Sequence, residues 1–375
     1  MKVVKILHII TGLKVGGAEN ALHRLIVNSP DGYKHEVLSL TTGGEMHSVF
    51  SNSNIEVVTI DFKNSFVSSM ISLVKVIKSK NPDIVQTWLY HSNLIGGIAA
   101  RLSGIKNIIW GLRGTAIPQS IISIHNIIIN LGALFSYFIP SYIVCNAQTV
   151  KNYHVRKKYC SKKIEIIENG FILHKDEPQK ESMLAEIKAN KESLLIGTVG
   201  RYDKLKDYPN MISALSIIMQ EFSNVHLILV GRGLDNLNIE LKNLISNSLD
   251  ISRVHLLGEK NNISSCLREL DIFCLSSRNE GFPNVLAEAM LMKIPCVSTN
   301  AGDAANLISD IGVLVPVEDH IKLALGLKYM IAMSKKERRK IGEKSYSHIR
   351  SNFSIENNIS KFCKLYMKLI NEKKY

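Results

Sequence analysis

Short apolar runs alternate with amphipathic stretches along almost the whole chain. The runs have the length of β-strands and are bounded by turn residues, whereas the stretches between them have helical periodicity. This alternation predicts open, mostly parallel sheets with helices on both faces. The predicted strands are Lys5–Ile10, Glu36–Thr41, Glu56–Ile60, Ile84–Gln86, Asn107–Trp110, Tyr142–Asn146, Leu194–Val199, Val225–Val230, Val254–Leu257, Asp271–Leu275, Pro295–Ser298 and Gly312–Pro316.

The alternation lapses once, over a charged and proline-containing stretch between two series of strands. A chain of 375 residues is also long for a single domain. We therefore expect an α/β domain over residues 1–170, a linker over 171–190 and a second α/β domain over 191–352. In such folds ligands bind at the carboxyl ends of the strands, and two facing sheets form a cleft between domains. The predicted helices include Glu19–Val27, Phe66–Ser79, Asn93–Leu102, Asn210–Phe222, Asn284–Met292 and His320–Met333.

The chain is basic, with 46 Lys and Arg against 33 Asp and Glu, and residues 1–170 alone carry 18 against 9. This excess points to nucleic acid, an anionic membrane surface or a phosphorylated substrate as partner. We expect no nucleic-acid partner, because the sequence has no recognition-helix motif, no zinc-ligand spacing and no interleaved aromatic and basic residues. The six cysteines lack C-x-x-C spacing, and the N-terminus reads as a strand and not as a signal peptide, so a cytoplasmic protein is expected.

Residues 114–150 contain no Asp, Glu, Lys or Arg, and a cluster of six basic residues follows at Lys151–Lys163. The apolar centre, Ile121–Ile139, contains polar residues and lies between two predicted strands of one sheet. We therefore expect a buried or interfacial helix and not a transmembrane span. Two interpretations remain open: a buried helix followed by a solvated basic turn, or a docking site for anionic lipid headgroups.

Two loops that follow predicted strands contain residues suited to an anionic ligand. In Thr11–Glu19, Gly16 and Gly17 let the backbone approach a ligand at a helix N-terminus, although a plain tight turn fits the same residues. In the second loop, Arg201 and Lys206 can place two cations on one diphosphate. A solvated basic loop is the alternative.

A third loop, Ser276–Met290, leads from a strand into a helix that starts near Pro283. The N–H groups of that first helical turn suit a phosphate. Glu280 and Glu288 would repel a phosphate, so these carboxylates suit sugar or ribose hydroxyls. An ordinary helix start with a capping acid is the alternative.

The Glu280-x7-Glu288 spacing in SSRNEGFPNVLAEAM resembles the signature of glycosyltransferase family 4, whose members are retaining enzymes with the GT-B fold. Further similarities follow in the family's order and cover essentially the whole chain. They are the glycine loop Val15–Glu19, the Asn-Gly pair of Glu168–Gly170, Gly200 and Arg201 with Lys206, the glycine turn Val230–Gly233 and the terminal helix Phe353–Ile370. The resemblance implies two Rossmann-like domains facing across a cleft, with residues 353–375 packing back on the N-terminal domain.

The resemblance also implies a binding site for a nucleoside-diphosphate sugar. Arg201 and Lys206 would hold the diphosphate in place of a metal, so no metal and no cofactor is expected. Glu288 would bind the nucleotide ribose, and Glu280 would bind hydroxyls of the transferred sugar. The other implied donor-binding residues of this domain are Gly231, Gly281, Phe282, Pro283, Asn284 and Val285.

In the first domain, Gly16 and Gly17 would approach the donor, and His91 stands at the place of the family's histidine at the reacting sugar. A structural histidine is the alternative. Two positions depart from the family pattern. Asp207 replaces a glycine after the lysine and would bring a negative charge close to the phosphate pair, and Ala301–Asn306 lacks the usual glutamate.

The implied activity is metal-independent, retaining transfer of a hexose or N-acetylhexosamine, from a UDP-sugar by preference, to a hydroxyl group. The basic first domain and the uncharged segment favour a polyprenyl-diphosphate-linked saccharide acceptor and peripheral binding at the inner face of the cytoplasmic membrane. The resemblance is to the branch that assembles bacterial surface polysaccharides such as O-antigen, capsule and exopolysaccharide. The alternatives are another GT-B enzyme, such as a nucleotide-sugar epimerase, and a non-catalytic basic nucleic-acid binder.

Overall fold

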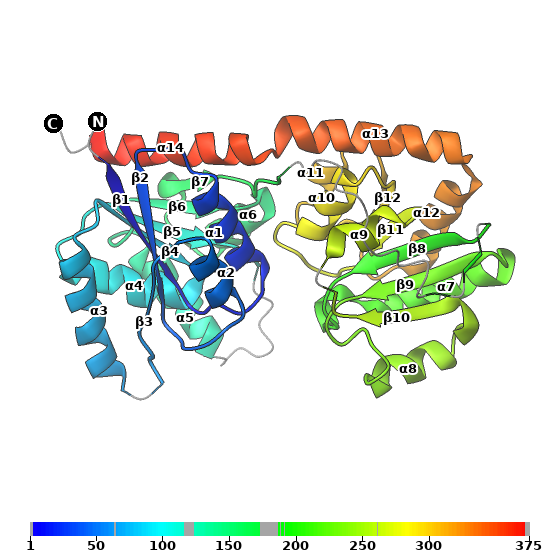
Figure 1. Ribbon diagram of the computed structural model, residues 1–375, viewed down its shortest axis with the longest axis horizontal. Helices are drawn as coiled ribbons and strands as arrows, with labels where there is room; N and C mark the ends of the chain where they lie inside the picture. Colours follow the sequence, from blue (N-terminus) through cyan, green and yellow to red (C-terminus); the bar gives the residue numbers. More distant parts are fainter. Residues whose placement is uncertain are drawn as a thin grey trace. The chain divides into compact units, whose positions relative to one another are not determined.

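The computed structural model describes residues 3–63, 65–115, 124–172, 187, 189–190, 192–260 and 262–371. The chain divides into two compact units (Figure 1). Unit 1 comprises Met1–Gly170 and Ile355–Tyr375, and unit 2 comprises Phe171–Ser354. Most of the predicted linker over 171–190 lies outside the described residues.

Unit 1 is built on a seven-stranded sheet with the order β3-β2-β1-β4-β5-β6-β7, in which every neighbouring pair is parallel. The central strand β4 is buried along its whole length, as expected for a parallel sheet covered on both faces. Its elements are β1 (Val4–Ile10), α1 (Gly17–Val27), β2 (Tyr33–Ser39), α2 (Met46–Asn52), β3 (Val57–Thr59), α3 (Phe66–Lys80), β4 (Ile84–Trp88), α4 (Tyr90–Leu102), β5 (Ile108–Leu112), α5 (Ile124–Phe135), β6 (Tyr142–Cys145), α6 (Gln148–Arg156), the 3-10 turn Ser161–Lys163, β7 (Ile164–Ile166) and α14 (Ile355–Asn371).

Unit 2 repeats this plan with a six-stranded parallel sheet of order β10-β9-β8-β11-β12-β13. Helix α7 contacts α12, whereas α10 contacts α9, α11 and α13. Its elements are β8 (Leu194–Val199), the 3-10 turn Lys204–Lys206, α7 (Tyr208–Glu221), β9 (Val225–Val230), α8 (Ile239–Ser246), the 3-10 turn Ile251–Arg253, β10 (Val254–Gly258), α9 (Ile263–Arg268), β11 (Ile272–Leu275), α10 (Asn284–Leu291), β12 (Cys296–Thr299), α11 (Ala304–Ile308), β13 (Val313–Val315), α12 (His320–Ala332) and α13 (Lys335–Asn352).

Each predicted strand coincides with or overlaps a strand of the structure, so the predicted parallel α/β class is confirmed. The sequence analysis missed the edge strand β7 and helices such as α13. Helix α13 is rich in charged residues and therefore shows little apolar periodicity. Its start does have a sequence signal, because Ser334 and Glu337 form a capping box.

The basic stretch Lys151–Lys163 is largely helical and not a simple turn, although Arg156, Lys158 and Lys162 are exposed to solvent as expected. Helix α6 takes up its first part and a 3-10 turn its last. Helix α5 precedes it and is not fully buried: Ile124 is 75% exposed and Leu134 58%. Residues 116–123 of the uncharged segment lie outside the described residues. No helix in the described ranges is long and apolar enough to cross a bilayer.

Each sheet reverses its strand order once, between β1 and β4 in unit 1 and between β8 and β11 in unit 2. Ligands in doubly wound folds bind at the carboxyl ends of the strands beside such a switch point. Gly16 follows β1 and His91 follows β4, whereas Arg201 and Lys206 follow β8 and Glu280 follows β11. The topology therefore carries the candidate residues to the switch point of their own sheet.

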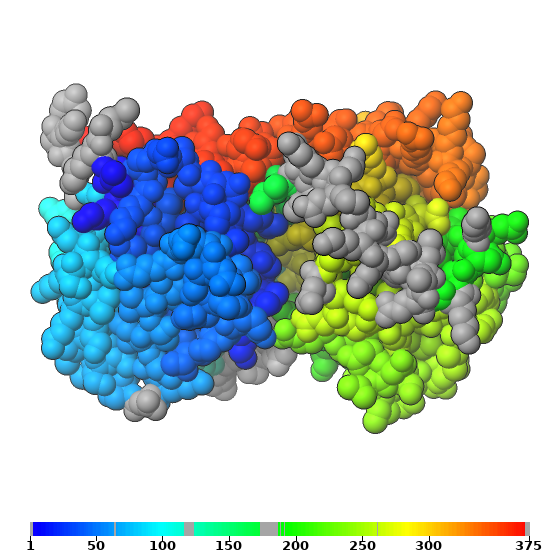
Figure 2. Space-filling view, in the orientation of Figure 1, coloured from blue at the N-terminus to red at the C-terminus, as the bar shows by residue number. Residues whose placement is uncertain are grey.

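The C-terminal helix α14 belongs to unit 1 and contacts α1. In Figure 2 this helix (red) lies against the N-terminal segment of the chain (blue). The Tyr366 hydroxyl and Gln86 Oε1, both buried, are 2.6 Å apart. Lys361 Nζ lies 2.6 Å from Glu168 Oε2, and Asn358 donates to the Glu168 carbonyl. A Cβ atom at Gly170 would lie 2.6 Å from Asn358 Cβ, so this helix explains the glycine after Asn169.

Unit 1 also contains two histidines, His154 and His35, that form no ion pair with a carboxylate among the described residues. His154 is fully buried, with Nδ1 at 2.7 Å from the Val150 carbonyl and Nε2 at 2.9 Å from the Tyr90 hydroxyl. Burial lowers the pKa of His154 to about 4, although the Val150 hydrogen bond opposes the shift. Burial also lowers the pKa of His35 to about 4. These imidazoles are neutral in the folded protein at pH 7.

We predict that the free energy of unfolding of unit 1 falls as the pH is lowered from about 6.5 to about 4. In that window the unfolded chain binds protons that the folded chain does not. His154→Gln should remove up to about 1.4 kcal/mol per pH unit from this slope. Urea denaturation can be followed by fluorescence, because both tryptophans of the chain, Trp88 and Trp110, lie in unit 1. His47→Gln, at an exposed position, is the control; an unchanged slope in His154→Gln would contradict the prediction.

Candidate active site

The backbone at the end of β8 is fixed by two glycines. Gly200 N donates to the Val230 carbonyl at 2.9 Å, and Gly231 N donates to the Gly258 carbonyl at 2.7 Å. Gly231 has φ +135°, and a Cβ atom there would lie 1.8 Å from the Gly200 carbonyl oxygen. Only glycine fits this position. Gly231 therefore sets the path of the loop that carries Arg201.

Asp203 orders the loop after β8. Its Oδ1 accepts from Leu205 N at 2.9 Å and caps the 3-10 turn, while its Oδ2 pairs with Arg201 Nε at 3.0 Å. The Arg201 side chain is 67% exposed, and its two terminal nitrogens have no partner within the described part of the chain. Its guanidinium can therefore donate a bidentate pair of hydrogen bonds to an anion.

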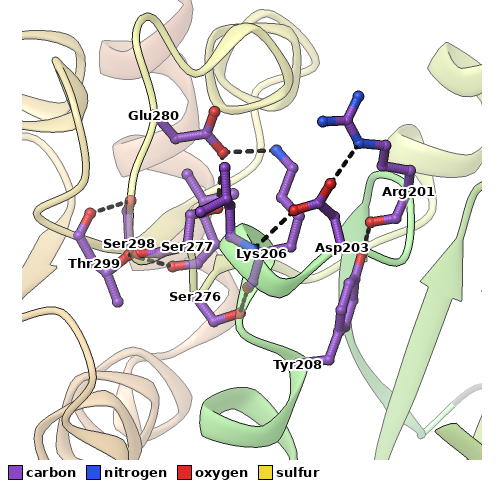
Figure 3. A network of polar contacts seen from close by, with 11 residues as sticks. Arg201, Asp203, Lys206, Tyr208, Ser276, Ser277, Glu280, Ser298 and Thr299 are labelled. Atoms are coloured by element: carbon purple, nitrogen blue, oxygen red, sulfur yellow. Dashed lines mark hydrogen bonds and ion pairs between the residues drawn. The ribbon is translucent and has the colours of Figure 1, made fainter. Parts of the chain in front are cut away.

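The structure brings Lys206 and Glu280 together, although 74 residues separate them in the sequence (Figure 3). Lys206 Nζ lies 2.6 Å from Glu280 Oε1, and Ser277 Oγ donates to the same oxygen at 2.8 Å. Ser276 Oγ donates to the Lys206 carbonyl at 2.7 Å. Both charged side chains keep limited access to solvent, with 22% of Lys206 and 15% of Glu280 exposed.

The loop that carries Glu280 is held from the next strand, β12. Thr299 Oγ1 donates to the Ser277 carbonyl at 2.6 Å (Figure 3). Gly302 has φ +60°, and a Cβ atom there would lie 2.5 Å from the Gly281 carbonyl oxygen. Asp303 N donates to that oxygen at 3.1 Å. The Ala301–Asn306 segment therefore supports the loop through its backbone, without the family's usual glutamate.

Helix α10 begins at Asn284, directly after Pro283, as the sequence predicts. Its N-cap residue, Pro283, provides no side-chain cap. Phe282 is buried and packs against Phe171, with ring centroids 6.0 Å apart, so its side chain is structural and only its backbone can serve a ligand. Glu288 lies in the second turn of α10 and is half-buried. The other two residues assigned to the donor here, Gly281 and Val285, flank the helix start and are also half-buried.

Asp207, the residue that replaces a glycine after Lys206, is buried and forms an ion pair. It is 1% exposed, and Arg278 Nε lies 2.8 Å from its Oδ2. Arg278 Nη2 donates to Oδ1 at 2.9 Å. The negative charge expected close to the phosphate pair is therefore present but paired with Arg278, an arginine that the sequence spacing does not reveal.

Gly16 and Gly17 form the start of α1, with Gly16 as the N-cap residue in an extended conformation. A Cβ atom at Gly16 would lie 2.5 Å from Glu19 Oε2, a side-chain atom. Burial raises the pKa of Glu19. The helix begins two residues earlier than predicted, so Gly17 belongs to its first turn and not to the preceding loop.

His91 lies in the first turn of α4, which begins at Tyr90 and not at Asn93 as predicted. Leu89 turns the chain into this helix with φ +74°. Burial and then the nearby His125, whose ring centroid is 6.5 Å away, lower the pKa of His91. A neutral imidazole at this sheet edge can donate or accept one hydrogen bond to a hydroxyl.

The sequence analysis missed three side chains that build the site in unit 2, namely Asp203, Ser277 and Arg278. Each lies in a polar loop after a predicted strand, which is the only signal that the sequence offers for it. Arg278 binds Asp207 on another loop, whereas Asp203 and Ser277 bind groups two or three residues away in their own loops. Among the described residues no cluster of three or more His, Cys, Asp or Glu could hold a metal ion.

Two family models match consecutive parts of the chain. The model "Glycosyltransferase Family 4" matches residues 15–175, and "Glycosyl transferases group 1" matches residues 179–348. The chain is 28% identical to the Escherichia coli UDP-Gal:alpha-D-GlcNAc-diphosphoundecaprenol alpha-1,3-galactosyltransferase over 244 residues. This alignment covers 62% of each protein. It is 23% identical to the *Staphylococcus aureus* capsular polysaccharide biosynthesis glycosyltransferase CapM, over 85% of this chain and 86% of that protein.

Among solved structures, Anabaena HepE in complex with UDP superimposes with a TM-score of 0.84 at 20% identity. The match covers 97% of this chain and all of HepE, and it shows a shared fold. The GT-B class expected from the sequence is thereby confirmed, whereas the facing of the two domains across a cleft stays a prediction. The two family models together span most of the chain, and the chain belongs to glycosyltransferase family 4.

Proposed function

We propose that the protein transfers a hexose or N-acetylhexosamine from a nucleoside-diphosphate sugar to a hydroxyl of a lipid-linked saccharide. The observation that carries this proposal is the arrangement at the switch point of unit 2. There Arg201 and Lys206 supply two cations, and Glu280 supplies a hydroxyl-binding carboxylate fixed at 2.6 Å from Lys206. Cations suit a diphosphate, and carboxylates suit sugar and ribose hydroxyls.

A UDP-sugar is the favoured donor. Support comes from the relatives, because the matched galactosyltransferase is named for UDP-Gal and HepE binds UDP in its crystal structure. Glu288 on α10 binds the ribose, and the N-terminus of that helix favours negative charge. The backbone of residues 281–285 and of Gly231 lies at the same sheet edge.

The reaction retains anomeric configuration through attack on the front face of the donor. The bond between the anomeric carbon and the phosphate oxygen breaks while the acceptor oxygen bonds to the same face. The leaving phosphate oxygen takes the acceptor proton. Glu280 suits hydrogen bonding more than nucleophilic attack, because its Oε1 already accepts from Lys206 and Ser277. Stabilisation of the leaving diphosphate by Arg201 and Lys206 is then the main catalytic term.

His91, Gly16 and Gly17 serve the same reaction from unit 1. The neutral imidazole of His91 contacts the reacting sugar, and the glycines allow the start of α1 to approach the donor. No metal ion is required, since two side-chain cations already oppose the charge of the diphosphate.

The acceptor is a polyprenyl-diphosphate-linked saccharide in the assembly of a cell-surface polysaccharide such as O-antigen, capsule or exopolysaccharide. The names of the matched galactosyltransferase and of CapM support this assignment. The protein binds peripherally to the membrane surface from the cytoplasmic side.

Helix α5 supports membrane binding because its exposed apolar residues share one face. The exposed residues of the helix recur at intervals of three or four: Ile124, Ile127, Leu131 and Leu134. The helix packs on the basic segment, since a Cβ atom at Gly132 would meet the Tyr159 hydroxyl and Cys160 N donates to Ser136 Oγ. An apolar stripe beside exposed lysines is the composition of a surface that binds anionic lipid.

The donor assignment predicts that one nucleotide sugar from a panel of UDP-, GDP-, ADP- and dTDP-sugars stabilises the protein against thermal unfolding. A ligand at 100 times its Kd adds about 2.7 kcal/mol to the free energy of unfolding. Thermal shift measurements across the panel identify the donor. If none of the sugars stabilises the protein, the proposed donor site is wrong.

Arg201→Ala and Glu288→Gln should lower turnover by a factor on the order of 10²–10³ without loss of fold, as for other lost charge-stabilising groups. Lys204→Ala is the matched control, because it removes an exposed cation from the 3-10 turn that follows Arg201. Assays use the donor found above, lipid-linked acceptor and EDTA, with circular dichroism to check the fold. Near-normal rates in the first two variants would overturn the site, and a strict need for divalent metal would overturn the metal-independent mechanism.

The protein should float with vesicles containing phosphatidylglycerol at low salt and bind weakly to neutral phosphatidylcholine vesicles. Replacing Ile127, Leu131 and Leu134 by serine should reduce this binding. The control replaces two exposed apolar residues of unit 2, Leu237 and Ile239, by serine. Absence of binding at low salt, or equal loss in both variants, would contradict membrane docking through α5.

A further inference from the structure

Asp207 occupies a backbone conformation that favours glycine, with φ 53° and ψ 53°. It precedes α7, yet its side chain does not cap that helix. The carboxylate is instead buried against Arg278. A costly backbone conformation and a buried charge are thus maintained together, one residue after Lys206.

Arg278 binds the turn that carries Lys206 through its backbone and its side chain. Its amide N donates to the Leu205 carbonyl at 2.8 Å. Nη2 donates to Asp207 Oδ1 at 2.9 Å, and Nε lies 2.8 Å from Oδ2, an ion pair by distance. The hydrogen bond to Asp207 is also the main reason that the pKa of Arg278 is raised.

These contacts belong to a regular set between two loops. Alternate residues of the loop after β11 hold the two adjacent residues Lys206 and Asp207: Ser276 binds the Lys206 carbonyl, Arg278 binds Asp207, and Glu280 binds Lys206 Nζ. The Arg278–Asp207 pair lies between the other two contacts along the loop. It therefore fixes the backbone from which the lysine side chain extends.

Each of the three guanidinium nitrogens of Arg278 already faces a carboxylate. Nε and Nη2 face Asp207, and Nη1 lies 3.1 Å from Glu318 Oε1. Without Arg278, the carboxylate of Asp207 would be an uncompensated buried anion next to Lys206. It would repel an anionic ligand at that lysine and compete for its ammonium group.

We propose that Arg278 is a positioning residue, which neutralises and anchors Asp207 so that Lys206 is available to the donor diphosphate. This inference rests on the proposed function, in which Lys206 binds that diphosphate. The arginine and aspartate act as one unit that replaces the glycine expected after the lysine.

The test is a double-mutant cycle with Arg278→Met, Asp207→Gly and the combination, in the full-length protein. Isothermal titration calorimetry measures binding of UDP, GDP, ADP and dTDP, and thermal unfolding is recorded for each variant. Arg278→Met should weaken binding of the preferred nucleoside diphosphate about tenfold or more, the size of one like-charge interaction at a partly buried site. Asp207→Gly suits the backbone and removes the carboxylate, so its affinity should stay within about threefold of wild type.

The decisive result is rescue: the double variant should bind within about threefold of Asp207→Gly, even if Arg278→Met alone folds poorly. Glu318→Gln is the matched control, because it removes the other carboxylate from the same guanidinium and should not change affinity. An equal loss on Arg278→Met in both backgrounds would show direct contact with the nucleotide and overturn the inference, as would no loss at all. If wild-type protein binds none of the four nucleotides, the proposed function fails, and the inference with it.

Discussion

Parallel strand pairing is the constraint on which the rest of the structure depends. Because every neighbouring pair is parallel, all carboxyl ends of a sheet meet at one edge, and each strand returns through a helix. The order reverses between β8 and β11, so the loops that follow these strands lie side by side. Lys206 and Glu280 meet for this reason, although they belong to separate parts of the sequence.

The site in unit 2 is held mostly by backbone geometry and short polar contacts. Gly231 and Gly302 admit neighbouring carbonyl groups that any side chain would displace. The Ser276 hydroxyl ties the two loops together, and the Ser277 hydroxyl holds Glu280 within its own loop. Such fixed donors and charges need little rearrangement when a charged ligand binds, which is the physical basis of electrostatic preorganisation.

Positive charge has two separate uses in the chain. In unit 2, Arg201 and Lys206 lie at the carboxyl edge of the sheet, where we propose that a diphosphate binds. Arg278 instead forms ion pairs with two carboxylates. In unit 1, some cations also have structural roles, as Lys163 Nζ contacts the carbonyls of Tyr137 and Pro140 beyond α5. The net charge of +13 therefore does not measure a single binding surface.

The α/β class, the two series of strands and the motif residues could be predicted from the sequence, because apolar periodicity and glycine placement are local properties. The sequence also located Arg201, Lys206 and Glu280 in loops after strands, which parallel topology turns into one site. Only the tertiary structure decided that α5 exposes an apolar stripe, that Lys151–Lys163 is largely helical, and that Arg278 neutralises Asp207. Those outcomes depend on which side chains distant segments bring together, and burial and ion pairing of that kind leave no spacing in the sequence.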